Sequence, residues 1–159
     1  MRNLHLNAFQ GGDGRRRVVE ALRSQALIRD EDLAQEIAIR VKVEEVPSGW
    51  TLISEGASDS DLFFILSGEF SIVIDGRVVA QKSAGEQVGE MVVVDPIRSR
   101  CASVIAASES VVARISESDF SALADKFPRL WRRIAMELAN RLRVEDGASH
   151  DPAKAGRAA

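Results

Sequence analysis

The pattern of apolar residues between positions 41 and 115 constrains the fold of this chain most strongly. The apolar runs there are short, rich in β-branched residues and separated by turn residues, as in SIVI, RVVA, SVIAA and SVVARI. Asp75-Gly76 lies between SIVI and RVVA and is a strong signal for a two-residue hairpin. About seven or eight short strands at this spacing predict a β-sandwich or jelly roll.

The sequence before this region has a helical pattern. Apolar residues recur at helical spacing over residues 15–28. An acidic run at residues 30–32 is typical of a second helix start, because negative charge is favoured at the positive end of the helix dipole. Residues 1–14 are polar and glycine-rich, and we expect them to be flexible.

The sequence after residue 115 also reads as helical. Ser116 and Asp119 resemble a capping box, and Pro128 suits the first turn of a final helix that we expect to end at Gly147. One apolar stripe runs along this final helix: Leu130, Ile134, Leu138 and Leu142. The stripe fits the core and a dimer seam equally well, so a homodimer stays open. We expect residues 146–159 to be a disordered tail.

Composition and charge limit the class of protein. The 159 residues fit one domain, and 45% hydrophobic residues can supply a core. A formal net charge of −3 argues against a polyanion as the main partner. Cys101 is the single cysteine, which excludes a disulfide within the chain and favours a reducing compartment. With no signal-like start and no membrane-spanning apolar stretch, a cytoplasmic protein is predicted.

The segment at residues 85–104, GEQVGEMVVVDPIRSRCASV, carries the residues with recognisable chemistry. Gly89 allows close approach of the backbone to a ligand. Arg100 offers a planar donor fork that matches phosphate oxygens, and the carboxylate of Glu90 can accept from a sugar hydroxyl. Together they predict a nucleotide-like ligand. The same two charges could also form an ordinary salt bridge beside a turn, and the residues alone leave that alternative open.

The segment resembles the phosphate-binding cassette of cyclic-nucleotide-binding domains. The family pattern is Gly-Glu, a short helix, and then Arg followed by small residues before a strand. Here it reads Gly89-Glu90-Met91 and then Arg100-Cys101-Ala102. The upstream stretch GWTLISEGASDSDLFFILSGEFSIVIDG resembles a second hallmark of the family, a glycine-bounded hairpin region. The resemblance covers residues 28–143 and implies an eight-stranded antiparallel jelly roll with N-terminal helices and a C-terminal lid helix.

The resemblance also implies a role for each residue of the site. Arg100 would pair with the cyclic phosphate, and Glu90 would accept from the ribose 2′-hydroxyl. Backbone N–H groups after Glu90, at Met91, and around Cys101 and Ala102 would complete the cradle. The residues implied to line the base pocket are Ile72 and Val79. The implied ligand is cAMP or cGMP, with cAMP favoured, and no cofactor is expected.

Two features of the segment depart from the family pattern. Cys101 stands where relatives have Ser, Thr or Ala, and a thiol is a poor hydrogen-bond donor to phosphate or guanine. Arg98 lies two residues before Arg100 and could compete for the phosphate role, although the Arg-Cys-Ala order favours Arg100.

Other functions find little support in the sequence. The two histidines, His5 and His150, lie in the predicted flexible ends, so a metal site of the cupin kind and a His-activated nucleophile at Cys101 are not expected. We predict no enzymatic activity. The basic run at residues 15–17 is typical of a solvated face, and no helix-turn-helix is expected after the last helix. Trp50 and Trp131 are expected in the core or the lid.

These observations predict one domain over residues 15–145 that binds a cyclic nucleotide and signals through its C-terminal helix to an effector protein. The alternative is a degenerate member of the same fold that acts as a protein-interaction scaffold without ligand.

Overall fold

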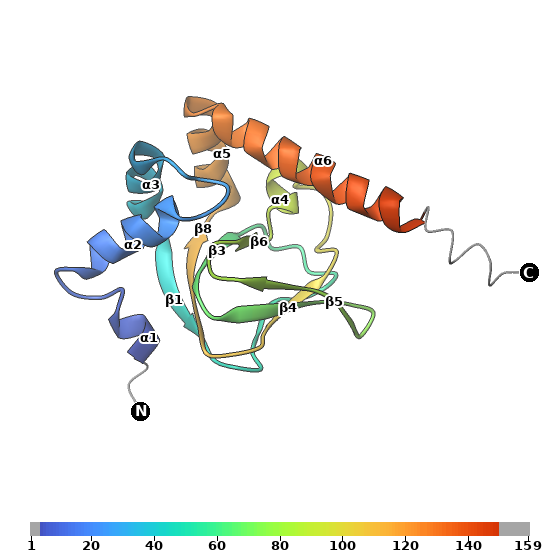
Figure 1. Ribbon diagram of the computed structural model, residues 1–159, viewed down its shortest axis with the longest axis horizontal. Coiled ribbons are helices and arrows are strands. Elements are labelled where there is room, and N and C mark those ends of the chain that lie inside the picture. The colour runs from blue at the N-terminus through green and yellow to red at the C-terminus, as the bar shows by residue number, and fades with distance from the viewer. Residues whose placement is uncertain (1–3, 150–159) are drawn as a thin grey trace, which may run out of the picture.

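The computed structural model describes residues 4–149 and shows two β-sheets flanked by helices (Figure 1). Three helices precede the strands: α1 (Leu4–Asn7), α2 (Gly14–Arg23) and α3 (Glu31–Ala38). The strands are β1 (Lys42–Val46), β2 (Thr51–Ile53), β3 (Leu62–Ser67), β4 (Glu69–Ile74), β5 (Arg77–Ser83), β6 (Gln87–Val88), β7 (Ser103–Ala106) and β8 (Ser110–Ile115). The helix α4 (Met91–Val94) interrupts them, and α5 (Glu117–Lys126) and α6 (Arg129–Ser149) follow.

Each sheet has four antiparallel strands. Their orders are β1-β8-β3-β6 and β2-β7-β4-β5. This arrangement confirms the predicted eight-stranded antiparallel sandwich with flanking helices. The hairpin between β4 and β5 turns at Asp75 (φ 49°) and Gly76 (φ 74°). Two successive positive φ angles match the turn type that suits the twist of paired strands.

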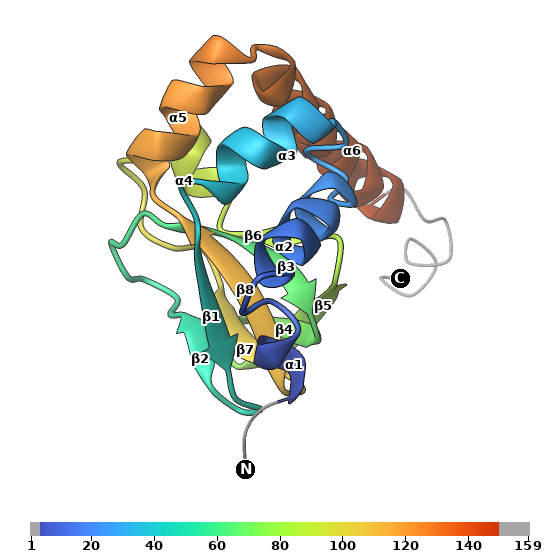
Figure 2. The same ribbon diagram turned by 90° about the vertical axis from the view of Figure 1, so that its left-hand side faces the viewer.

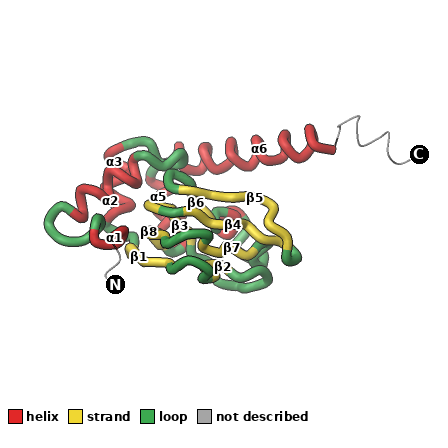
Figure 3. Tube along the Cα trace, turned by 60° about the horizontal axis from the view of Figure 1, so that its bottom comes forward, coloured by secondary structure: helices red, strands yellow, loops and turns green. Residues whose placement is uncertain are grey.

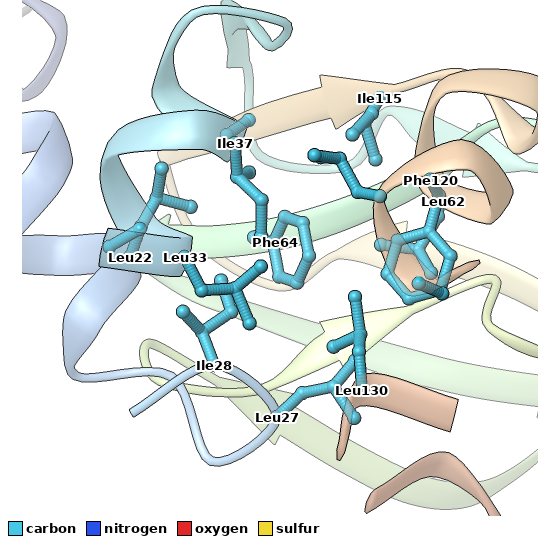
Figure 4. Packing of buried hydrophobic residues seen from close by; sticks show 14 of the residues in the cluster. Leu22, Leu27, Ile28, Leu33, Ile37, Leu62, Phe64, Ile115, Phe120 and Leu130 are labelled. Carbon is cyan, nitrogen blue, oxygen red and sulfur yellow. The ribbon is translucent and has the colours of Figure 1, made fainter. Parts of the chain in front are cut away.

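The strand β3 (Leu62–Ser67) contributes to two separate cores, one on each face of its sheet. Every residue from 62 to 66 is buried, so both faces of the strand are covered. Side chains alternate between the faces of a strand. Phe63 and Ile65 therefore join the cluster between the two sheets, whereas Leu62 and Phe64 join a larger cluster beneath the helices. Figure 4 shows Phe64 among side chains from α2, α3 and the start of α6.

The helices α2, α3, α5 and α6 gather at one side of the sandwich, whereas α1 lies apart from them beside the strands (Figure 2). The start of α6 is fixed to the region before α3, because Arg129 and Arg133 both pair with Asp30. The carboxylate of Asp30 therefore makes no hydrogen bond as a helix cap, although it stands at the N-cap of α3. At the start of α5 the predicted cap is present, since the Ser116 hydroxyl accepts from the Asp119 backbone N–H at 3.1 Å.

The ends of the chain differ in detail from expectation. A short helix, α1, lies within the segment expected to be flexible, and Phe9 packs against the larger core. The helix α6 continues past Gly147 to Ser149, so residues 146–149 are helical rather than part of a tail. Residues 150–159, with His150, lie outside the described part of the chain. The domain limits of 15 and 145 stay predictions.

Two further expectations concern exposure and length. Trp50 was expected in the core or lid, but 65% of its surface is exposed. Trp131 fits the expectation, because it packs edge-on against Phe120 and borders α4. No helix within residues 4–149 combines the length and the apolar character that crossing a membrane requires.

Candidate functional site

The segment at residues 89–103, called the cassette below, lies between β6 and β7 and includes the short helix α4. It begins at Gly89, whose φ is +85°. A Cβ atom at this position would lie 2.8 Å from Nη1 of Arg100 and 2.9 Å from the carbonyl oxygen of Asp61. Glycine is therefore required here both for the backbone conformation and for close approach of the arginine.

Arg100 is buried, with 8% of its surface exposed, and its guanidinium is held from three sides. Nη1 donates to the carbonyl oxygen of Gly89 at 3.2 Å, and Nη2 donates to the carbonyl oxygen of Asp61. Nη2 and Nε also donate to the two carboxylate oxygens of Asp59, at 2.9 and 3.4 Å. These four hydrogen bonds orient the fork and leave one of its five N–H groups, on Nη1, outside them.

The Asp59 carboxylate responds to this contact. Its hydrogen bonds with Arg100 lower the pKa of Asp59 below the ordinary value of 3.8, against the opposing effect of partial burial. Its side chain is still 49% exposed, whereas that of Arg100 is 6% exposed. The pair therefore joins a fixed buried cation to a carboxylate at the protein surface.

Glu90 is the second buried charge of the cassette, with 4% of its surface exposed. Its Oε1 accepts a hydrogen bond from Nη2 of Arg141, a residue of α6. Gln87, just before the cassette, also contacts α6, because its Nε2 donates to Oε2 of Glu137 at 2.6 Å. The final helix is thus joined by one polar contact to the cassette and by a second to β6, and Figure 1 shows the helix passing above α4.

The remaining predicted residues differ in burial, and their roles toward a ligand stay predictions. Met91 begins α4 and is 36% exposed, Cys101 is exposed, and Ala102 is half-buried. Ile72 on β4 packs against the core between the sheets, and Val79 on the adjacent β5 is 56% exposed. The structure thus places the two implied base-pocket residues on neighbouring strands.

The structure separates the two arginines that the sequence left in competition. Arg98 has an 82% exposed side chain and pairs with Asp95 inside the cassette loop. Arg100 is the buried one. Of the two, Arg100 is the one whose guanidinium donates to backbone carbonyl groups, those of Gly89 and Asp61.

Sequence reasoning missed Asp59, Asp61, Glu137 and Arg141. The stretch SDSD at residues 58–61 received no role in the predicted site, although its charge could have suggested a partner for an arginine. Nothing in the sequence pairs Arg141 with Glu90, which lies 51 positions earlier. Within residues 4–149, no three His, Cys, Asp or Glu side chains come together as metal ligands.

Comparisons with known proteins identify a family and related proteins. The family model "Cyclic nucleotide-binding domain" matches residues 43–127. The Pycsar effector protein XpPycTIR of Xanthomonas perforans is 41% identical over 138 residues, which make up 86% of this chain and 46% of that protein. The chain therefore spans about half the length of this relative. Pycsar effector protein BcPycTIR of Burkholderia cepacia is 40% identical with the same coverage.

One solved structure illustrates the likeness in fold. It is the catabolite activator protein of Thermus thermophilus, with a TM-score of 0.69 and 25% identity, covering 77% of this chain and 60% of that one.

Proposed function

Because the chain belongs to the cyclic nucleotide-binding domain family, we propose that it binds a 3′,5′-cyclic nucleotide in the cassette and reports binding through α6. The cyclic phosphate pairs with Arg100, and the ribose 2′-hydroxyl donates to Glu90. The observation that carries this proposal is the burial of two opposite charges, Glu90 and Arg100, ten residues apart in one cassette behind an obligatory glycine. Buried charges at such a position are typical of binding sites.

The donor geometry around Arg100 supports a phosphate ligand. One N–H of Nη1 is outside the four hydrogen bonds of the guanidinium, and the Asp59 carboxylate is half-exposed. A phosphate oxygen can accept directly from the remaining N–H on Nη1. If Asp59 moves aside, the phosphate can also accept from the N–H groups that Asp59 releases, which makes the contact with Arg100 bidentate. The carbonyl contacts to Gly89 and Asp61 keep the guanidinium oriented in either case.

The base is expected over Ile72 and Val79, and the ligand is cAMP or cGMP, with cAMP favoured. The exposed aliphatic surface of Val79 supports an apolar contact with the base, because burying it removes apolar area from water. Cys101 lacks the hydroxyl with which relatives can contact guanine, and this favours adenine.

The output of binding is proposed to be regulatory. The helix α6 contacts both Gln87 and Glu90, so a ligand at Glu90 can shift the equilibrium between arrangements of α6. The similar proteins in Xanthomonas perforans and Burkholderia cepacia are called effector proteins and are about twice as long as the matched segment. We propose that this chain is the sensing part of such an effector and is not itself an enzyme.

One observation favours the alternative of a scaffold without ligand. Both predicted ligand groups already have protein partners, since Arg100 pairs with Asp59 and Glu90 pairs with Arg141. In a degenerate site these pairs would be permanent, and the protein would act through contacts with other proteins alone.

Isothermal titration calorimetry distinguishes the two functions. The chain is titrated with the 3′,5′-cyclic monophosphates of adenosine, guanosine, cytidine and uridine, and with 5′-AMP as the control for the cyclic phosphate. We expect saturable heat with at least one cyclic nucleotide and much weaker heat with 5′-AMP. If none of the four binds at millimolar concentration and none raises the melting temperature, the sensor proposal fails and the scaffold takes its place.

A further inference from the structure

Two residues on one face of α6 contact β6 and the cassette that follows it. Glu137 and Arg141 are four positions apart, one above the other on the helix. Glu137 accepts from Gln87 at 2.6 Å, and Arg141 donates to Glu90. Gln87 and Glu90 are both buried, so these contacts lie at the covered side of the helix.

Arg141 is the charge partner of a carboxylate that would otherwise be isolated. The side chain of Glu90 is 5% exposed, and an unpaired ionised carboxylate at such burial is strongly unfavourable. Arg100, the other cation of the cassette, directs its four hydrogen bonds to Asp59, Asp61 and Gly89 instead. The charge partner of the buried Glu90 carboxylate is therefore supplied by α6.

The contact leaves the carboxylate able to accept a second donor. Arg141 donates to Oε1 of Glu90, and a carboxylate has lone pairs on both of its oxygens. A ribose hydroxyl can donate to Oε2 while Arg141 stays in place. If Arg141 left instead, a neutral hydroxyl alone would have to compensate the buried charge, which is the less favourable arrangement.

We infer that Arg141 is a positioning residue of the nucleotide site: it orients the Glu90 carboxylate to accept the ribose 2′-hydroxyl. This inference rests on the proposed function. It assigns to α6 part of the discrimination between ribose and 2′-deoxyribose, because Arg141 acts on the ligand only through Glu90. Docking of α6 and recognition of the sugar are then one event.

The test compares cAMP with 2′-deoxy-cAMP, or the corresponding guanosine pair if the protein prefers cGMP. Binding of each nucleotide is measured calorimetrically for the wild type, Arg141→Gln, Arg141→Lys and the control Arg143→Gln. Arg143 is an exposed arginine of the same helix, two positions away. Melting temperatures verify that each variant is folded.

We expect Arg141→Gln to weaken cAMP binding about tenfold or more and to change 2′-deoxy-cAMP binding little, so that discrimination between the two sugars shrinks. Arg141→Lys should retain part of the discrimination between the two sugars, and Arg143→Gln should bind both nucleotides as the wild type does. An equal loss of affinity for both nucleotides in Arg141→Gln would mean that Arg141 only supports the fold. Tighter binding of cAMP by this variant would mean that Arg141 competes with the ribose for Glu90. Either result overturns the inference. Failure of the wild type to bind any cyclic nucleotide removes the proposed function, and this inference with it.

Discussion

Gly89 has a positive φ and also crowded surroundings. These are two different reasons for requiring glycine, and a second glycine of the chain has only the first. At Gly76, in the β4–β5 turn, φ is also positive (+74°), but a Cβ there would meet nothing within 4 Å. At Gly89 a Cβ would lie within 3 Å of both Arg100 and a backbone oxygen. Gly76 serves conformation alone, whereas Gly89 also makes room for the arginine.

This difference gives a matched pair of substitutions. Gly76→Ala should destabilise the protein by about 1 kcal/mol, the strain of a left-handed conformation, and leave nucleotide binding unchanged. Gly89→Ala should destabilise it by at least about 1 kcal/mol more, because Arg100 must move, and should weaken binding. Urea unfolding and calorimetry measure both effects. Equal losses of stability in the two variants would contradict the packing described around Gly89.

The phosphate role of Arg100 predicts a contrast with Arg98. Arg100→Leu removes a buried charge partner, which costs roughly 2–5 kcal/mol, so binding should weaken about thirtyfold or more. Arg98→Leu should have little effect, because this side chain is exposed. Arg100→Lys keeps a charge but loses the fork, and it serves as the second variant if Arg100→Leu fails to fold. Similar affinities for the Arg98 and Arg100 variants would refute the assignment.

The Arg100–Asp59 pair predicts how stability depends on pH. Hydrogen bonds with Arg100 lower the pKa of Asp59 below 3.8 in the folded protein. A lowered pKa stabilises the fold at pH values above the unfolded pKa, and this stabilisation is lost as the pH falls through the folded pKa. The melting temperature should therefore fall in the acid range below about pH 5. Asp59→Asn should lower the melting temperature at neutral pH and make its decline in acid shallower. An unchanged decline in acid would show that the Arg100–Asp59 pair does not contribute to the pH dependence of stability.

At the scale of elements, α6 is the part of the fold whose environment changes most along its length. Leu130 and Ile134 are buried in its first turns and Leu138 is half-buried against the larger core, but Leu142 is 62% exposed, so the predicted apolar stripe is covered only as far as Leu138. Figure 3 shows the helix continuing beyond the layer of strands. Glu137 and Arg141, on either side of Leu138, add polar contacts with Gln87 and Glu90. The apolar packing of the helix thus ends before Leu142, and a helix that is packed over only part of its length suits a movable element.

Hydrogen exchange with and without nucleotide tests the role of α6. We expect protection to rise over residues 131–143 and in the cassette, because a ligand bound at Glu90 favours the docked arrangement of the helix. The amides of β8, buried under both conditions, provide the internal reference. Protection that rises only in the cassette would mean that nucleotide binds without using this helix as its switch.

Local signals allowed most elements to be predicted from the sequence. The β4–β5 hairpin follows from Asp75-Gly76, and the start of α5 follows from Ser116 with Asp119, because both depend on neighbours in the chain. The predicted end of the final helix was wrong, because α6 continues through Gly147 to Ser149 although glycine has a poor helix propensity. Trp50 was also placed wrongly, because a large apolar side chain does not by itself indicate burial.

At the scale of the whole molecule, the site depends on contacts between distant segments. Sequence predicted the cassette, whose glycine, carboxylate and arginine lie within twelve residues. It missed Asp59 and Arg141, because their contacts with the cassette join positions 41 and 51 residues apart. Only the packing of the β2–β3 loop and of α6 against the cassette brings them together. The residues that orient a ligand group are thus harder to predict than the group itself.

An NMR titration of the chain with a cyclic nucleotide tests the central claim most directly, because it reports binding and its location together. Backbone amide shifts are followed as cAMP is added, with cGMP and 5′-AMP titrated in parallel. The account predicts saturable shifts centred on Gly89, Glu90 and residues 100–103, extending to α6 around Arg141, and much smaller shifts with 5′-AMP. No shifts at millimolar cyclic nucleotide, or saturable shifts confined to residues outside the cassette, would contradict it.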